Sequence, residues 1–184
     1  MTNDQLKKFN VEIVTFANTA VLDESWKEIK VGSLWQDRPV VFIFLRHFGC
    51  PSCRAHAEQV WRGREKFEKT GAKIVFVGNG QPNFISGFKQ DLGINEAVIY
   101  TDPSLKAFRA CGFNRGFLAS IGPNSMLNGM KLIAKGYKAN ISSGGGDWWQ
   151  LGGIVAVQKS GTVTYHYISK SLGDFPTEIE QQIT

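Results

Sequence analysis

The feature that most constrains the fold is a pair of closely spaced cysteines between a buried strand and a helix. Residues 40–45 are all apolar and rich in β-branched and aromatic types, which is typical of a strand buried on both faces. A short loop leads to Cys50-Pro51-Ser52-Cys53, after which apolar residues recur at helical spacing until Gly71. Residues 73–78 contain a second apolar strand. Two strands joined by a helix in this way predict a βαβ unit with a right-handed crossover.

The alternation of helix and strand continues along the chain. Asp102-Pro103 supplies an N-cap and a first helical residue for a helix that carries Cys111 and ends at Gly112. Two apolar stretches on either side of Ser160-Gly161 predict a β-hairpin. The remaining expected elements are a helix over 84–92, a strand over 97–100, hairpin strands over 154–159 and 162–168, and a last helix that starts near Pro176 with Ile179 and Ile183 facing inward.

Two segments have a weaker pattern. The first 36 residues suggest only a short strand over 11–16, so we treat 1–36 as an N-terminal extension. Between 114 and 149 glycines become frequent, and a helix over 125–135 is the one element we expect there. We interpret 114–149 as an insertion before the hairpin in a single domain that spans 1–184.

The position of the cysteines gives them a specific chemistry. Cys50 is expected at the N-terminus of its helix, where free backbone N–H groups and the helix dipole stabilise an anion and lower a thiol pKa. Arg46, His47 and Arg54 surround the motif and add positive potential, and Pro51 stiffens the first turn. Cys53, three residues further on, is within reach to form a disulfide with Cys50. The motif therefore favours thiol redox chemistry.

Other uses of these side chains stay open. A Cys-x-x-Cys pair can hold zinc, but structural zinc sites need two more ligands, and only Cys111 and three scattered histidines are present. Cys111 could resolve an oxidised thiol, although its apolar helix face favours a buried structural role. His47 could act as a base or simply shape the loop. His56 is expected on the helix surface and His166 in the hairpin, and neither is a site candidate.

Residues 44–54 (FLRHFGCPSCR) resemble the active-site segment of peroxiredoxin-like AhpC/TSA-domain proteins in the thioredoxin superfamily, including the prostamide/prostaglandin F synthase-like group. Residues 101–105 with Gly112, and residues 146–153, resemble two further segments of that family in the same order. The resemblance covers roughly residues 30 to 175. It implies an α/β fold of the thioredoxin-like, peroxiredoxin type: a three-layer sandwich with a central mixed sheet and helices on both faces.

The chain departs from that family at informative positions. Peroxiredoxins carry Pro-x-x-x-Thr-x-x-Cys, and the overlay puts Cys53 at the peroxidatic cysteine, Cys50 at the threonine and His47 at the proline. Gln150 lies nearest the position of the peroxide-polarising arginine. Thioredoxins have a cis-proline before the penultimate strand, and Gly153 aligns with it.

The resemblance implies a thiol-dependent oxidoreductase that reduces peroxides or a small oxidised substrate and is regenerated by a thioredoxin or glutathione system. The alternatives are reduction of protein disulfides, or a zinc-stabilised or non-catalytic scaffold. We expect Cys50 to be the nucleophile because it should be the more exposed sulfur. Trp148, Trp149 and Gly153 are candidates to line a substrate cleft, although the two tryptophans could instead cover the core.

Composition narrows the function classes. The net charge of +5 comes from 21 basic and 16 acidic residues, which is below what a dedicated nucleic-acid binder usually shows. Residues 103–146 hold no acidic residue, so the charge belongs mainly to that segment, where it could attract an anionic substrate or merely be solvated. No apolar run is long enough to span a bilayer and no secretion signal pattern is present, so a cytoplasmic protein is expected. No pattern predicts a flavin, haem, nicotinamide or metal cofactor, and a homodimer stays open.

Overall fold

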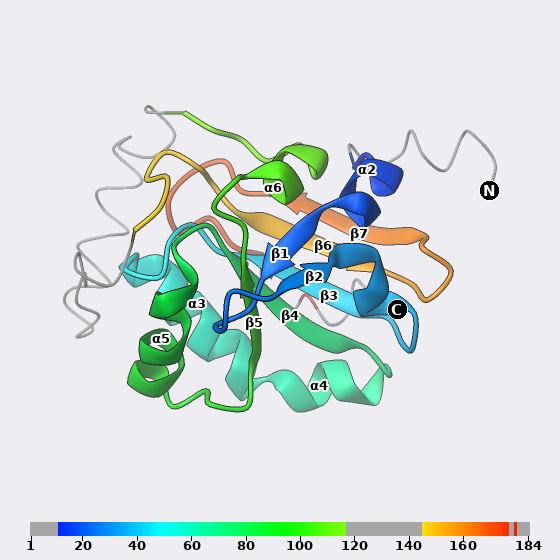
Figure 1. The fold of residues 1–184 in the computed structure, drawn as a ribbon. Coiled ribbons are helices and arrows are strands. Elements are labelled where there is room, and N and C mark those ends of the chain that lie inside the picture. Colours follow the sequence, from blue (N-terminus) through cyan, green and yellow to red (C-terminus); the bar gives the residue numbers. More distant parts are fainter. Residues whose placement is uncertain (1–10, 117–144, 177–178, 180–184) are drawn as a thin grey trace.

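The centre of the molecule is a mixed β-sheet. The computed structural model describes residues 11–116, 145–176 and 179. Within these residues seven strands are joined in the order β2-β1-β5-β4-β3-β6-β7 (Figure 1). In chain order the strands are β1 (Ala20–Leu22), β2 (Glu28–Lys30), β3 (Val40–Phe44), β4 (Lys73–Gly78), β5 (Val98–Thr101), β6 (Gly153–Val157) and β7 (Val163–Ile168). The predicted mixed sheet is confirmed.

The predicted βαβ unit forms the middle of this sheet. Every residue of β3 is buried, as its uninterrupted apolar sequence requires. β3 runs parallel to β4, with Val40 opposite Lys73 and Phe44 opposite Val77. β4 pairs in parallel with β5, whereas β6 is antiparallel to β3 and β7 antiparallel to β6. The hairpin is therefore also confirmed.

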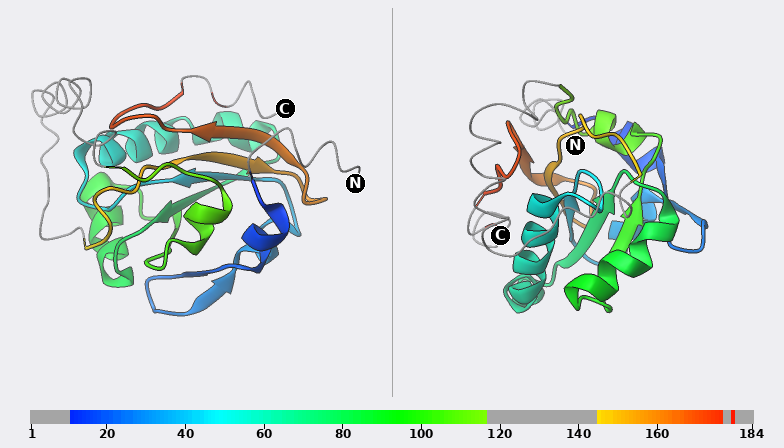
Figure 2. Two further views of the ribbon diagram at one scale, coloured as in Figure 1. Left: turned by 90° about the horizontal axis from the view of Figure 1, so that it is seen from above. Right: turned by 90° about the vertical axis from the view of Figure 1, so that its left-hand side faces the viewer.

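Helices cover both faces of the sheet (Figures 1 and 2), and the sheet separates the hydrophobic core into two clusters. On one face, Val41 and Ile43 of β3 belong to the same cluster as Cys50 and Cys53. On the other face, Val40 belongs to a cluster with Phe16 and Phe108. The first face is covered by α3, α4 and α5, and the second by α2, η1 and α6. These elements are α2 (Ile13–Asn18), η1 (Val31–Trp35), α3 (Pro51–Arg62), α4 (Arg64–Lys69), η2 (Pro82–Phe84), α5 (Ile85–Leu92) and α6 (Lys106–Ala110). The predicted three-layer arrangement is confirmed.

The N-terminal segment differs from the prediction. The strand expected over 11–16 is wrong, because Ile13 and Phe16 are buried one helical turn apart in α2 while Val14 is 70% exposed. The described part of the extension also supplies two strands that were not expected. β1 pairs antiparallel with β2 and with β5, so this segment extends one edge of the sheet.

Two predicted helices have different limits. The helix expected up to Gly71 is divided into α3 and α4 at Gly63, whose φ of −89° and ψ of 7° are not helical. The helix expected from Pro103 begins only at Lys106, because Leu105 adopts a left-handed φ of 58°. Its N-cap is therefore Leu105 and not Asp102 as predicted, although Asp102 Oδ2 accepts a hydrogen bond of 2.7 Å from the Ala107 N–H in the first turn.

Several predictions fall largely on residues outside the described ranges. These are the helix over 125–135, most of the insertion, and the last helix, of which only Ile179 is described beyond residue 176, as a buried core residue. The single domain over 1–184 stays a prediction.

Candidate active site

The two cysteines lie at the start of α3, where β3 delivers the chain. Cys50 is the N-cap of this twelve-residue helix and Pro51 its first residue, as expected. The loop before it is fixed to the carboxyl end of β4, because the N–H of Asn79, the residue directly after β4, donates to the Arg46 carbonyl at 3.0 Å. Cys50 N–H donates to the His47 carbonyl at 3.1 Å. The main chain therefore places the dithiol at the carboxyl end of the parallel strands.

The surroundings of Cys50 favour its thiolate. A hydrogen bond from the Cys53 thiol is the largest contribution, and despite the opposing effect of burial the pKa of Cys50 is lowered to about 6. The Arg46 guanidinium, the Ser52 hydroxyl and the backbone N–H of Cys53 also contribute to this lower pKa. Cys50 Sγ and Ser52 Oγ are 3.2 Å apart. At neutral pH Cys50 is therefore mainly a thiolate.

Cys53 is in the opposite state. Burial, followed by the hydrogen bond and negative charge of Cys50, raises the pKa of the Cys53 thiol well above its ordinary value. Its Sγ accepts a hydrogen bond of 3.3 Å from the Arg46 backbone N–H. In the reduced chain the pair thus combines one ionised sulfur with one protonated sulfur, so the first nucleophile is Cys50 and not Cys53.

The two sulfurs hardly differ in exposure. Cys50 is 2% exposed and Cys53 is fully buried, so both lie in the core cluster beneath α3. The order of exposure is the expected one, but the difference is too small to choose between the two thiols, and electrostatics rather than exposure distinguishes them.

Arg46 and His47 lie beside the dithiol and are buried. The Nη2 of Arg46, an 8% exposed residue, donates to the Trp148 carbonyl, whereas its Nε has no hydrogen-bond partner among the described residues. The His47 ring packs against the Trp148 ring with 4.1 Å between centroids. Burial, with a smaller contribution from Arg46, lowers the pKa of His47 to about 4, so this imidazole is neutral at physiological pH.

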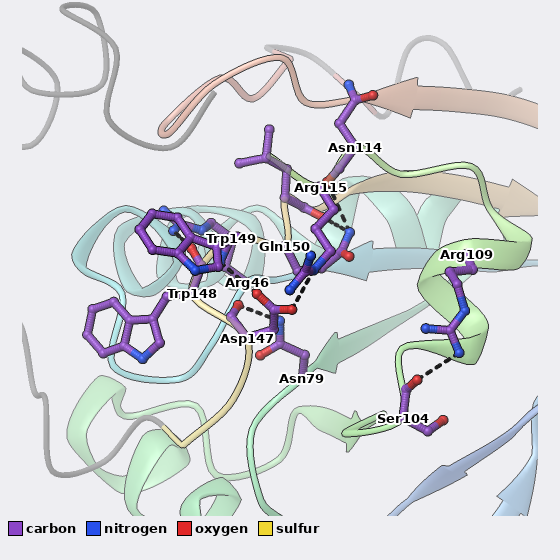
Figure 3. Close-up of polar contacts among 11 residues, drawn as sticks. Arg46, Asn79, Ser104, Arg109, Asn114, Arg115, Asp147, Trp148, Trp149 and Gln150 are labelled. Atoms are coloured by element: carbon purple, nitrogen blue, oxygen red, sulfur yellow. Dashed lines mark hydrogen bonds and ion pairs between the residues drawn. The ribbon is translucent and has the colours of Figure 1, made fainter. Parts of the chain in front are cut away.

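Residues 145–151 form a wall beside the dithiol loop and are held at several points (Figure 3). Asn79 Nδ2 donates to the Asp147 carbonyl at 3.1 Å, and Arg115 Nε forms an ion pair of 2.6 Å with the Asp147 carboxylate. Although burial acts to raise it, the pKa of Asp147 is lowered by Arg115 and by the Trp149 N–H. Trp148 and Trp149 are 43% and 36% exposed, so they do not serve as core residues.

Three predicted supporting or cleft residues point to other partners. Arg54 forms an ion pair of 2.9 Å with Asp91 of α5. Gln150 uses its amide N–H groups on two backbone carbonyls, at 2.8 and 3.1 Å, and so offers no free donor there. Gly153 is packed inside the sheet, since a Cβ there would lie 2.3 Å from the Phe113 ring on the face opposite the dithiol.

The predictions for Cys111 and His166 agree with the structure, whereas the prediction for His56 is wrong. Cys111 is fully buried in the cluster on the opposite face of the sheet from the dithiol, and burial raises the pKa of its thiol well above the ordinary value. His56 does not lie on the helix surface: it is 5% exposed and stacks on Phe175 with 3.8 Å between ring centroids. His166 is in β7, as predicted, with Nε2 2.9 Å from the Cys111 carbonyl oxygen.

Sequence reasoning missed the roles of three residues that shape this site, Ser52, Asn79 and Arg115. Ser52 and Asn79 had readable signals, because one lies inside the motif and the other directly follows a buried strand at the carboxyl end of the sheet. No signal in the sequence indicated the pairing of Arg115 with Asp147. Within the basic segment 103–146, Arg115 pairs with Asp147 and Arg109 donates to the Ser104 carbonyl at 2.9 Å (Figure 3). Lys131, Lys135 and Lys138 lie outside the described residues.

Two classes of site find no support in the described ranges. No three His, Cys, Asp or Glu side chains are grouped there in a way that could hold a metal ion. None of the helices described has the length and apolarity needed to cross a membrane.

Comparison with solved structures finds peroxiredoxin-like proteins of similar fold. A peroxiredoxin-like protein from Aquifex aeolicus superposes with a TM-score of 0.63 at 16% identity, covering 90% of this chain and 81% of that chain. Peroxidoxin BcpB from Mycobacterium tuberculosis gives 0.60 at 15% identity, covering 85% and 84%. At these identities the comparison establishes the fold alone, and it confirms the predicted class.

Sequence comparison establishes the family. Prostamide/prostaglandin F synthase of Danio rerio is 33% identical over 154 residues, which are 80% of this chain and 74% of that protein. Thioredoxin-like protein AAED1, chloroplastic, of Arabidopsis thaliana is 29% identical over 166 residues, 85% of this chain, and the chain spans 65% of that relative's length. A family model described as AhpC/TSA antioxidant enzyme matches residues 60–171, a range that begins after the two cysteines. The predicted resemblance is confirmed, and with it a thiol-dependent oxidoreductase at the level of the family: the chain belongs to the AhpC/TSA antioxidant enzyme family.

Proposed function

We propose that this protein reduces peroxides through a dithiol–disulfide cycle in which Cys50 is the nucleophile and Cys53 resolves it. The observation that carries this proposal is the opposite displacement of the two thiol pKa values at one helix N-terminus, downward for Cys50 and upward for Cys53. A thiolate is the form that attacks oxygen, and Cys50 has that form in the reduced chain. Once Cys50 is a neutral sulfenic acid, its negative charge no longer raises the pKa of Cys53, so Cys53 can lose its proton and attack as a thiolate.

The chemical steps balance as follows. The Cys50 thiolate attacks the terminal oxygen of a hydroperoxide, so an S–O bond forms and the O–O bond breaks. The alkoxide takes up a proton and leaves as an alcohol, and Cys50 becomes a sulfenic acid. The Cys53 sulfur then attacks the Cys50 sulfur, a disulfide forms, and water leaves with the hydroxyl of the sulfenic acid and the Cys53 proton.

The cycle needs a reductant outside this chain. A dithiol of the thioredoxin type or glutathione returns two electrons and two protons to the disulfide. Because free thiols persist in reducing compartments, we propose a cytoplasmic location, with the chloroplast as the alternative suggested by the name of the Arabidopsis relative. A homodimer remains a separate proposal without a supporting contact.

The alternative substrates differ in size and chemistry. A protein disulfide must bring its own sulfur against Cys50, and the 2% exposure of Cys50 favours a small substrate over a folded protein. An endoperoxide is a second small-molecule candidate, because several relatives are named prostamide/prostaglandin F synthase. A zinc-stabilised scaffold lacks a group of ligands among the described residues.

A substrate panel tests the proposal. Reduced protein is mixed with hydrogen peroxide, cumene hydroperoxide, a cyclic endoperoxide and oxidised insulin, and thiol loss is followed in the native chain, Cys50→Ser and Cys53→Ser. We expect peroxide consumption to be lost in Cys50→Ser, and Cys53→Ser to perform one turnover without forming the intramolecular disulfide. If both variants consume every substrate as the native chain does, the dithiol is not the reacting group.

A further inference from the structure

The nucleophile of this site is covered. Cys50 is 2% exposed, yet a substrate oxygen has to reach van der Waals contact with its Sγ before a bond can form. The loop that carries Cys50 is in direct contact with Trp148, whose ring packs on His47. The Trp148 carbonyl accepts a hydrogen bond from Arg46 (Figure 3). Trp148 is therefore placed to control access to the dithiol.

The two residues that Trp148 contacts each carry a buried polar atom whose hydrogen-bonding capacity is unused. Arg46 Nε and His47 Nδ1 are both buried and have no hydrogen-bond partner among the described residues. Buried polar atoms are nearly always paired, because an unpaired one costs on the order of 1–3 kcal/mol. Two such atoms on consecutive residues, next to a thiolate that the Arg46 charge stabilises, indicate a polar site built for a ligand.

The neighbours of Trp148 are held by contacts of their own, and the peptide that carries the Trp148 carbonyl is also held, because its Trp149 N–H donates to Asp147 Oδ1 at 2.8 Å. Asp147 is held by Asn79 and Arg115, and the Trp149 carbonyl accepts a hydrogen bond of 3.1 Å from the Gly116 N–H. None of these contacts involves the Trp148 carbonyl. Exchange of that one carbonyl for another oxygen therefore costs the Arg46 guanidinium no charge-assisted hydrogen bond.

We propose that Arg46 and His47 form the substrate-oxygen site of this enzyme and that Trp148 occupies and covers it in the resting state. The Trp148 carbonyl holds the place of a peroxide oxygen on Nη2. When the substrate displaces it, Nη2 and Nε donate to the oxygen that becomes the alkoxide as the O–O bond breaks. His47 Nδ1 provides a further polar contact for the substrate. This inference rests on the function proposed above.

In this account Arg46 is a catalytic residue with two separable effects. Its positive charge acts on the ionisation of Cys50, and its two directed N–H groups act on the leaving oxygen. Lysine keeps the charge but has no planar pair of donors. A donor aimed at developing negative charge typically changes a rate by at least tenfold, so the two effects can be measured independently.

The test measures peroxide reactivity and Cys50 ionisation on the same variants. Stopped-flow oxidation by cumene hydroperoxide gives the first, and the pH titration of thiolate ultraviolet absorbance gives the second. For Arg46→Lys we expect the rate per thiolate to fall about tenfold or more while the titration midpoint moves little. A rate that falls only in proportion to the thiolate fraction would overturn the proposal. Arg46→Gln, which also removes the charge, is the second variant, and its rate per thiolate should fall at least as far.

The covering role of Trp148 has its own readout. Alkylation of Cys50 by iodoacetamide, normalised to the thiolate fraction, should rise several-fold in Trp148→Ala and stay at the native value in Trp148→Phe, which keeps a ring on His47. Trp26→Ala, a change of another exposed tryptophan on the β1–β2 connection, is the matched control. Equal alkylation in Trp148→Ala and the native chain would refute the cover. If the native chain is not oxidised by any peroxide, the proposed function itself fails, which is a distinct result.

Discussion

Replacing Cys53 by alanine should raise the pKa of Cys50. The hydrogen bond from the Cys53 thiol is the largest of the contributions that bring the Cys50 pKa to about 6, and Cys53→Ala removes it. The Arg46 charge and the Ser52 hydroxyl still lower the pKa in this variant while burial raises it, so the pKa should move upward from about 6 toward or beyond the ordinary thiol value of about 8.5.

The pKa difference determines at which pH the reactivity of Cys50 should be measured. At pH 7 a thiol with a pKa of about 6 is roughly 90% ionised and one of about 8.5 is roughly 3% ionised. A less basic thiolate is also a weaker nucleophile, with a Brønsted slope of about 0.4–0.5, which cancels most of that thirty-fold advantage. At pH 5 the difference in ionised fraction grows to about 300-fold, so about a 20-fold difference in reactivity survives.

The assay is a pair of pH titrations on Cys111→Ala backgrounds, so that only the dithiol reports. Thiolate absorbance gives the ionisation midpoint without requiring access to the buried sulfur. The alkylation rate at pH 5 gives the reactivity. We expect a midpoint near 6 for the dithiol chain and a clearly higher one after Cys53→Ala, with slower alkylation at pH 5. A midpoint near 8.5 in the dithiol chain, or one unmoved by Cys53→Ala, would refute the electrostatic reasoning.

The remaining predictions concern stability and the third thiol. Burial lowers the pKa of His56 to about 3 in the folded chain, so below about pH 6.5 the unfolded chain binds a proton that the folded chain does not, and stability is lost as the pH falls. His56→Phe, which keeps a ring against Phe175, should reduce the loss of unfolding free energy between pH 7 and pH 5 by about 2 kcal/mol in urea titrations, and an unchanged loss would contradict this. Cys111→Ala should leave the rate of peroxide oxidation unchanged in stopped-flow experiments, because Cys111 lies across the sheet from the dithiol, and a slower rate would give it a resolving role. Gly78→Ala should cost about 1–3 kcal/mol in urea unfolding, because its Cβ would lie 2.5 Å from the buried Phe48 ring, and a stability equal to the native chain would show that this ring moves freely.

The sequence was sufficient where the chain encodes structure locally. The apolar runs of β3 and β4 are continuous, and the period changes clearly after Pro51, so the βαβ unit and the position of the dithiol at a helix N-terminus could be predicted. The strand predicted over 11–16 failed because six residues fit a period of two nearly as well as a helical turn. β1 and β2 have only three residues each and depend on their neighbours in the sheet.

The site was harder to predict because its surroundings come from distant parts of the chain. Arg46 meets the Trp148 carbonyl across 102 positions of sequence, and Asn79 meets Asp147 across 68. His56 is buried by Phe175 in the same way. No local pattern contains these contacts, which is why the exposure of Cys50, the surface position of His56 and the direction of Arg54 were misjudged from sequence.

The central claim is that Cys50 attacks the peroxide and Cys53 resolves it. Peptide mass mapping after treatment with a stoichiometric amount of cumene hydroperoxide, in the presence of a sulfenic-acid trap, tests it most directly. We predict the trap on Cys50 in the Cys53→Ser variant, and in the native chain a disulfide between Cys50 and Cys53 with Cys111 still a free thiol. The trap on Cys53 in the Cys50→Ser variant at the native rate, with Cys50 of the Cys53→Ser variant unmodified, would contradict the account.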